Sequence, residues 1–189
     1  MRRAARAALL AAGALAVAET TRAGRGRALD DRLFAWANSR GRPALDRVFT
    51  GVTELGSLYA SLGAGATLAL AGRRREAARA VVAATATWGL GQALKKAFRR
   101  PRPYETENPL RLLIARPRGT SWPSSHPAVL TTFVTVAARD LGLSSKGRGA
   151  VLGLGLAVAA SRVYLGVHYP SDVVGGVLLG RAVADLVAE

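Results

Sequence analysis

From residue 51 onward, the hydrophobic residues fall into long blocks separated by charged or proline-rich segments. None of the blocks alternates apolar and polar residues with the period of two that a half-buried strand requires. Their length and composition are those of helices. The pattern therefore predicts an all-α fold with helices at residues 51–72, 77–97, 124–140, 150–167 and 171–188.

The segments between these blocks predict how the helices are joined. Residues 99–123 hold five of the eight prolines and are typical of an ordered loop. The runs RRRE at residues 73–76 and SSKGRG at residues 144–149 predict turns. Glycines in the last two blocks would let helices approach closely in a bundle. They are Gly153, Gly155, Gly175, Gly176 and Gly180.

The first 50 residues form a different segment. Residues 1–18 have a basic start, a short apolar stretch and a small-residue end, which is typical of a signal peptide or a short signal anchor. An apolar helix of about 12 residues spans only about 18 Å, too short for about 30 Å of hydrocarbon. A surface helix is the alternative. Residues 31–40 predict an amphipathic, interfacial helix, so we divide the chain into residues 1–50 and a domain at 51–189.

Composition places this bundle in a membrane. The formal net charge is +15, half of the residues are hydrophobic, and the mean hydropathy is +0.17. Basic residues lie between apolar blocks on both sides of the predicted bundle, which argues against a nucleic-acid-binding face. We therefore predict a polytopic membrane protein that contacts the bilayer and no nucleic acid. The absence of cysteine excludes disulfides and thiolate chemistry.

Three polar clusters interrupt the apolar pattern at helix ends. They lie at residues 95–103, at WPSSH (122–126) and at SRVYLGVHYPSD (161–172), and the last two hold both histidines of the chain. In an up-and-down bundle all three meet at one membrane face, whereas the turns at 73–76 and 144–149 lie at the other. The sequence therefore predicts an active site at one face of the bundle.

The residue types in these clusters favour a phosphate ligand. Lys95, Arg102 and Arg162 would repel one another unless an anion joined them, and arginine matches phosphate oxygens with several donors. Ser124 opens a helix, where free backbone N–H groups and a capping hydroxyl favour an oxyanion. Asp172 follows His168 by four residues, a spacing at which the carboxylate can accept a hydrogen bond from the imidazole.

The spacing of these residues resembles the type 2 phosphatidic acid phosphatase (PAP2) superfamily, which includes bacterial acid phosphatases and vanadium haloperoxidases. That family carries K-x6-R-P, then P-S-x-H, then S-R-x5-H-x3-D. Here these motifs run from Lys95 to Pro103, from Pro123 to His126 and from Ser161 to Asp172. The resemblance covers roughly residues 50–188. One departure is Ser125, where many members carry glycine.

The resemblance implies a role for each matched residue. His168 would be the nucleophile, Asp172 would orient it, and His126 would protonate the leaving oxygen and then activate water. The remaining matched groups would hold the phosphate oxygens: Lys95, Arg102, Ser124, Arg162 and the backbone N–H of Ser125. No carboxylate pair suited to two metal ions accompanies the clusters, so we expect no metal and no cofactor.

The resemblance thus implies a membrane phosphatase that acts on a lipid phosphate through a phosphohistidine. Phosphatidate, phosphatidylglycerol phosphate, polyprenyl pyrophosphate and polyprenyl-linked sugar phosphates all remain possible substrates, and the oligomeric state stays open. The alternatives are a vanadate-dependent peroxidase, a basic lipid-binding scaffold and a transporter. An N-terminal signal or anchor with its arginines inside would place the active site on the extracytoplasmic face of a multi-pass protein.

Overall fold

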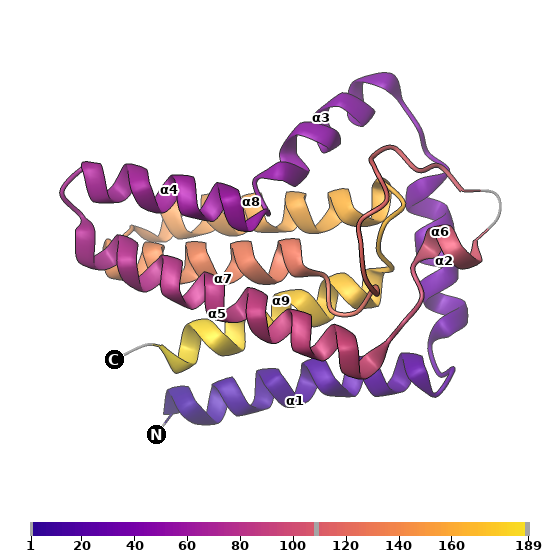
Figure 1. Ribbon diagram of the computed structural model, residues 1–189, viewed down its shortest axis with the longest axis horizontal. Helices are drawn as coiled ribbons and strands as arrows, with labels where there is room; N and C mark the ends of the chain where they lie inside the picture. The colour runs from indigo at the N-terminus through magenta and orange to yellow at the C-terminus, as the bar shows by residue number, and fades with distance from the viewer. Residues whose placement is uncertain (1, 108–109, 188–189) are drawn as a thin grey trace.

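The computed structural model describes residues 2–107 and 110–187, and every regular element in those ranges is a helix. The all-α prediction is therefore confirmed (Figure 1). The elements are α1 (Arg2–Arg22), α2 (Arg27–Asn38), α3 (Pro43–Glu54), α4 (Leu58–Leu70), α5 (Arg74–Phe98), α6 (Pro103–Thr106), α7 (Ser125–Asp140), α8 (Ser145–Tyr164) and α9 (Pro170–Leu186).

Helix α7 lies at the centre of the bundle and packs against α4, α5, α8 and α9. Its neighbours are rich in alanine and glycine, and these small residues bring the helix backbones together. A Cβ at Gly176 would collide with the carbonyl oxygen of Ser124, and a Cβ at Gly180 would collide with that of Ala128. Both glycines were predicted to allow close helix contact, and α9 uses them to approach α7.

The predicted boundaries hold for three helices and fail for two. Helices α5, α7 and α9 match the predicted blocks to within a few residues. The predicted helix at 51–72 is wrong, because the chain breaks between α3 and α4, where the Ser57 hydroxyl caps α4 by accepting from the Ala60 N–H. The predicted turn at 144–149 is also wrong, because Ser144 caps α8 and the following residues form its first turn.

Helices α1 and α2 pack onto the rest of the chain. Helix α1 lies along α9 (Figure 1). Ala7, Ala14 and Ala18 are buried, and Arg6 forms an ion pair with Asp185 at 2.5 Å. Whether residues 1–18 act as a signal peptide or an anchor stays a prediction.

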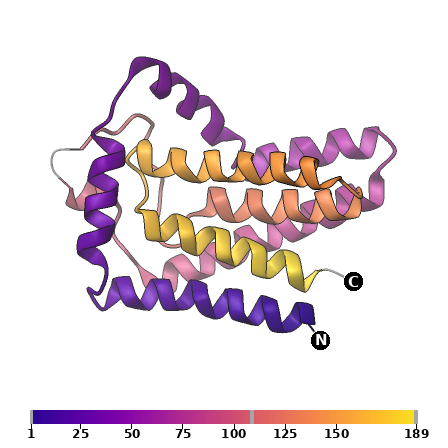
Figure 2. The ribbon, with the colours of Figure 1, turned by 180° about the vertical axis from the view of Figure 1, so that it is seen from behind.

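Helix α2 crosses the end of the bundle where α9 begins, as both views show (Figures 1 and 2). The amphipathic helix predicted at residues 31–40 lies largely within it. However, Asp30, Phe34 and Asn38 of α2 are buried against α8, α9 and the nearby loop, so this helix is part of the packed structure.

Among the described residues, one helix, α1, combines the length and apolar composition needed to cross a membrane, and α4 is a shorter apolar helix. Helices α7 and α9 are too short, at 16 and 17 residues, and the longer helices α5 and α8 carry several charged residues. One such helix near the N-terminus does not establish how many times the chain crosses a membrane, because a signal sequence has the same composition. The multi-pass arrangement therefore stays a prediction.

Candidate active site

The three polar clusters meet at one end of the bundle. The last turn of α5, the loop at residues 99–124, the first turn of α7 and the connection between α8 and α9 all lie there (Figures 1 and 2). The structure brings every predicted site residue to this end: Lys95, Arg102, Ser124, Ser125, His126, Arg162, His168 and Asp172. The predicted up-and-down arrangement therefore positions the clusters as expected.

His168 lies in the connection between α8 and α9 and is only 2% exposed. Arg102 lies with Nη1 3.1 Å from His168 Nε2. A guanidinium only donates hydrogen bonds, so Nε2 must be the acceptor and the ring proton must sit on Nδ1. The contact with Arg102 therefore selects the tautomer whose Nε2 carries a lone pair, the form that a nucleophilic imidazole requires.

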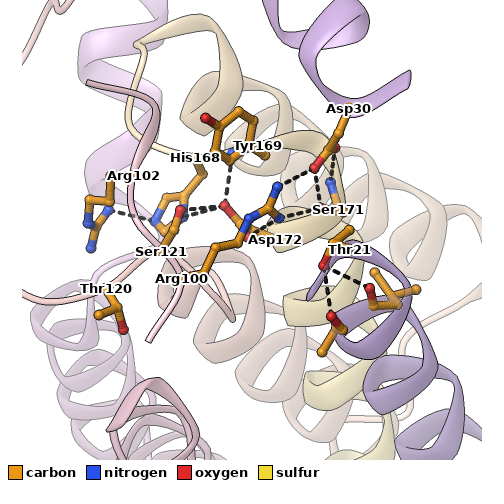
Figure 3. A network of polar contacts seen from close by, with 12 residues as sticks. Thr21, Asp30, Arg100, Arg102, Thr120, Ser121, His168, Tyr169, Ser171 and Asp172 are labelled. Carbon is orange, nitrogen blue, oxygen red and sulfur yellow. Dashed lines mark hydrogen bonds and ion pairs between the residues drawn. The ribbon is translucent and has the colours of Figure 1, made fainter. Parts of the chain in front are cut away.

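Ser121 connects Asp172 to the other ring nitrogen. The Ser121 hydroxyl lies 3.3 Å from His168 Nδ1 and donates a short hydrogen bond to Asp172 Oδ2 (Figure 3). The direct hydrogen bond predicted between Asp172 and His168 is not formed, because Nδ1 and Oδ2 are 3.5 Å apart. The same Oδ2 accepts the Tyr169 N–H at 2.9 Å, so the carboxylate faces the backbone as well as the serine.

A second chain of contacts holds Asp172 from the far side (Figure 3). Arg100 donates from Nη1 to Asp172 Oδ1 at 2.8 Å and from Nη2 to Asp30 Oδ2 at 2.6 Å. Asp30 on α2 in turn accepts the backbone N–H and the hydroxyl of Ser171. The guanidinium of Arg100 also stacks 4.3 Å from the ring centre of Tyr169. Helix α2 is thereby tied to the carboxylate beside His168.

Two of the predicted phosphate ligands are fixed by carbonyl groups of the loop. Lys95 donates from Nζ to the carbonyls of Thr120 and Ser121 at 2.7 and 3.0 Å. Arg102 donates to the carbonyls of Gly119 and Val167 at 2.7 and 3.0 Å. An ammonium group has three N–H donors, so Lys95 keeps one for a further acceptor.

Arg162 and Ser124 are buried with unused hydrogen-bonding groups. Arg162 donates from Nη1 to the Thr53 hydroxyl at 2.6 Å, but its buried Nε has no hydrogen-bond partner among the described residues. The Ser124 hydroxyl is also buried and, within the same ranges, has no partner. The prediction that this hydroxyl caps α7 is wrong, because it makes no hydrogen bond to the first turn of the helix.

Ser125 and His126 form the first turn of α7, whose N–H groups have no acceptor within the helix. The Ser125 hydroxyl accepts a hydrogen bond of 3.4 Å from Gln92 on α5. His126 packs against the break between α3 and α4, since a Cβ on Gly56 would lie 2.8 Å from its Cβ. The break that the sequence pattern missed thus adjoins the second histidine.

The charges of the site act directly on His168. Burial lowers the pKa of His168 well below its usual range, and the nearby cations of Arg102, Lys95 and Arg162 lower it further. A low pKa keeps the imidazole neutral, in agreement with its contact to Arg102. The site therefore pairs a neutral histidine with an excess of buried positive charge.

Sequence patterns did not single out Ser121, Arg100, Asp30, Thr53 or Gln92. Arg100 occupies an unspecified position of the first motif, and Ser121 precedes the second motif by two residues. Asp30 and Thr53 lie on helices outside the motifs and reach the site only through packing. Among residues 2–107 and 110–187, no group of three or more His, Asp or Glu side chains is arranged to hold a metal ion. A metal-independent reaction stays a prediction.

Comparisons with known proteins agree with this arrangement. Residues 76–188 match the sequence profile of the PAP2 superfamily. A decaprenylphosphoryl-5-phosphoribose phosphatase of Mycobacterium tuberculosis is 33% identical over 152 residues, which are 77% of this chain and 80% of that protein. An undecaprenyl-diphosphatase of Sulfolobus acidocaldarius is 37% identical over 99 residues, but these cover 51% of this chain and only 46% of the relative.

Two crystal structures share the fold. LpxE of Aquifex aeolicus superposes with a TM-score of 0.77 at 28% identity, covering 84% of this chain and 94% of that one. A transmembrane PAP2-type phosphatidylglycerolphosphate phosphatase of Bacillus subtilis superposes with a TM-score of 0.84 at 24% identity. That match covers 96% of this chain and 94% of that one.

Proposed function

The chain belongs to the PAP2 superfamily, and from this premise we propose that it is a membrane-bound phosphatase that hydrolyses the phosphate ester or diphosphate of a lipid. The observation that carries this proposal is the set of unused donors around His168. Lys95 retains an N–H, the Arg162 Nε has no partner within the described ranges, and the Ser124 hydroxyl is unpaired there as well.

Unpaired buried donors are costly, so they mark the position of a missing acceptor. A phosphate group is an acceptor with enough oxygen atoms to satisfy all three, and its negative charge would offset the repulsion among the buried cations. The first-turn N–H groups of α7 add donors of the kind that bind phosphate. A neutral ligand could accept hydrogen bonds from these donors, but it would not offset the positive charge of the buried cations.

The proposed reaction has two displacements at phosphorus. Substrate phosphate takes the hydrogen bonds of Arg102, which releases the Nε2 lone pair of His168. Nε2 then forms a bond to phosphorus while the bond to the leaving oxygen breaks. His126, which can carry a proton once the negative charge of the bound phosphate offsets the surrounding cations, protonates that oxygen. His126 next removes a proton from water, which attacks the phosphohistidine and restores His168. The fixed cations stabilise the charge on the transferring group throughout.

For the substrate, we propose a polyprenyl phosphate or diphosphate. The names of the archaeal and mycobacterial relatives both denote polyprenyl-linked phosphates, and the mycobacterial protein is matched over most of both chains. Phosphatidate and phosphatidylglycerol phosphate are the alternative substrates, because the same reaction would hydrolyse either lipid. All of them present a terminal phosphoryl group on a membrane-anchored chain.

We further propose a multi-pass protein whose active site lies on the extracytoplasmic face. The N-terminal ends of α5 and α8, at the opposite end of the bundle, carry the arginines at residues 73–75 and Lys146, and the cytoplasmic ends of membrane helices favour such residues. The chain has no cysteine, so single cysteines report topology directly. A membrane-impermeant maleimide added to intact cells should label the Thr106→Cys variant and should not label the Ser145→Cys variant. The reverse labelling pattern would show that the active site faces the cytoplasm.

The function is tested by phosphate release from the purified protein in detergent with EDTA present. The panel contains undecaprenyl diphosphate, a polyprenyl phosphoribose phosphate, phosphatidylglycerol phosphate and phosphatidate. Turnover of at least one lipid that His168→Ala abolishes and exposed Ser145→Ala retains supports the proposal. A wild-type protein that is folded yet inactive on the whole panel would contradict it.

A further inference from the structure

A second cavity lies at the end of the bundle opposite His168. It has a volume of about 490 Å³ and is lined by residues of α1, α7, α8 and α9. Its wall includes Arg139 of α7, near the end of the helix that begins at Ser125 in the active site. At 1.5 Å per residue, the two sites are about 20 Å apart along the bundle. The cavity is therefore separate from the catalytic machinery.

The cavity is strongly cationic at its outer end. Its charged lining consists of Arg3, Arg6, Arg139, Arg148, Arg181 and Asp185. The single carboxylate, Asp185, is already engaged by both the Nε and Nη2 atoms of Arg6. Arg148 uses its Nε on the Leu143 carbonyl, which leaves its two terminal nitrogens for another acceptor. The charge of the lining thus favours an anion.

The inner part of the same cavity is apolar. Along α8 the lining continues from Arg148 to Leu152 and Leu156, which is about 12 Å deeper into the bundle. The side chains of Leu152 and Leu156 are 51% and 56% exposed despite their hydrophobic character. Val177 of α9 and Val134 of α7 complete this part of the wall. A phospholipid has the same arrangement of charge and apolar surface. Its anionic headgroup would lie among the arginines at the outer end, and its acyl chain would lie along the apolar walls.

We propose that this cavity binds an anionic phospholipid of the bilayer, with its phosphate among the arginines and an acyl chain along Leu152 and Leu156. Basic pockets between membrane helices on the cytoplasmic side recognise such headgroups. The lipid would stabilise α1 against α8 and α9, since all three helices contribute to the cavity. This inference goes beyond the proposed hydrolase activity, because a phosphodiester such as phosphatidylglycerol lacks a terminal phosphoryl group to remove.

The test measures lipid adducts on the full chain by native mass spectrometry in a neutral detergent. Dioleoyl phosphatidylglycerol is titrated against dioleoyl phosphatidylcholine, which has the same chains and no net charge. The wild type should retain phosphatidylglycerol about tenfold more strongly, because both headgroups carry a phosphate but the arginines repel the quaternary ammonium of phosphatidylcholine. Equal retention of the two lipids would overturn the proposal, and phosphate release plays no part in the readout.

Variants distinguish lipid binding in this cavity from a nonspecific attraction of the lipid to the basic surface. Arg148→Gln with Arg181→Gln should abolish the preference, whereas Arg74→Gln with Arg75→Gln, at the same end but outside the lining, should retain it. Equal losses in both pairs would contradict a defined site. Gly149→Phe gives a charge-neutral check, because a Cβ there meets no atom within 4 Å and the ring would fill the cavity. This variant should also lose the preference, and its unfolding temperature shows whether the bundle is intact.

Discussion

Asp172 and His168 face each other with 3.5 Å between Oδ2 and Nδ1, and the hydroxyl of Ser121 connects the two side chains. The carboxylate therefore acts on the imidazole through a serine whose own proton is directed to Asp172. Because Nδ1 carries the ring proton, it can donate to the Ser121 oxygen. This relay orients the ring without bringing the carboxylate into direct hydrogen-bond contact with it.

The relay predicts an intermediate effect for Ser121→Ala. Loss of a hydrogen bond in a charged network costs about 1.5–3 kcal/mol, so kcat should fall about 10- to 100-fold with little change in KM. Asp172→Asn should cost more, about 10³-fold, because it also removes the charge that stabilises an imidazolium. Steady-state kinetics of both variants, with exposed Ser145→Ala as control, checks this. A normal kcat for the Ser121→Ala variant would show that Ser121 does not contribute to catalysis.

The contact between Arg100 and Asp30 predicts that α2 influences catalysis from outside the motifs. Asp30→Asn weakens the charge pair that holds Arg100 against Asp172 and should lower kcat about tenfold while KM stays within about twofold. The neighbouring Asp31 lies on the same helix and pairs instead with Arg27 at 3.8 Å. Asp31→Asn is the matched control, and equal kcat values for the two variants would contradict a positioning role.

The environment of His168 predicts its protonation behaviour. Burial and the nearby Arg102 and Lys95 cations lower its pKa, so the neutral form persists as the pH falls through about 6.5, where a free histidine titrates. The chain has two histidines, and His126→Ala leaves the His168 signal alone in an imidazole NMR spectrum. That signal should show the Nδ1–H tautomer and no titration between pH 6 and 9. A midpoint at or above 6.5 would contradict this electrostatic account.

The break between α3 and α4 predicts an unusual sensitivity at a glycine. A Cβ on Gly56 would collide with Val158 and the Cβ of His126, and overpacking of this kind costs about 1–3 kcal/mol. Gly56→Ala should lower both the unfolding temperature and kcat, because His126 must move. Gly51→Ala on α3 meets no atom within 4 Å, so it should leave kcat unchanged and should not lower the unfolding temperature, because alanine favours a helix more than glycine does. Thermal unfolding and turnover of the two variants provide the comparison.

The motifs could be predicted from the sequence because their residues lie at helix ends whose order along the chain fixes which end of the bundle they share. The hydrophobic pattern could not locate the break at residues 55–57, since apolar residues continue through it and Ser57 caps a helix inside the block. It also could not connect Asp30 to Asp172, which are far apart in the chain and meet only because α2 packs across the start of α9. Ser121 precedes its motif by two positions and differs little from an ordinary loop serine until His168 is placed beside it.

The central claim, a covalent phosphohistidine formed on His168, is tested most directly by the stereochemical course of the reaction. A substrate whose transferring phosphorus is made chiral with sulfur and oxygen isotopes is hydrolysed in isotopically labelled water, and the configuration of the released thiophosphate is determined. Each in-line displacement inverts the phosphorus, so the two displacements of the proposed mechanism predict net retention. Net inversion would show that water attacks the substrate directly and would contradict a phosphohistidine intermediate.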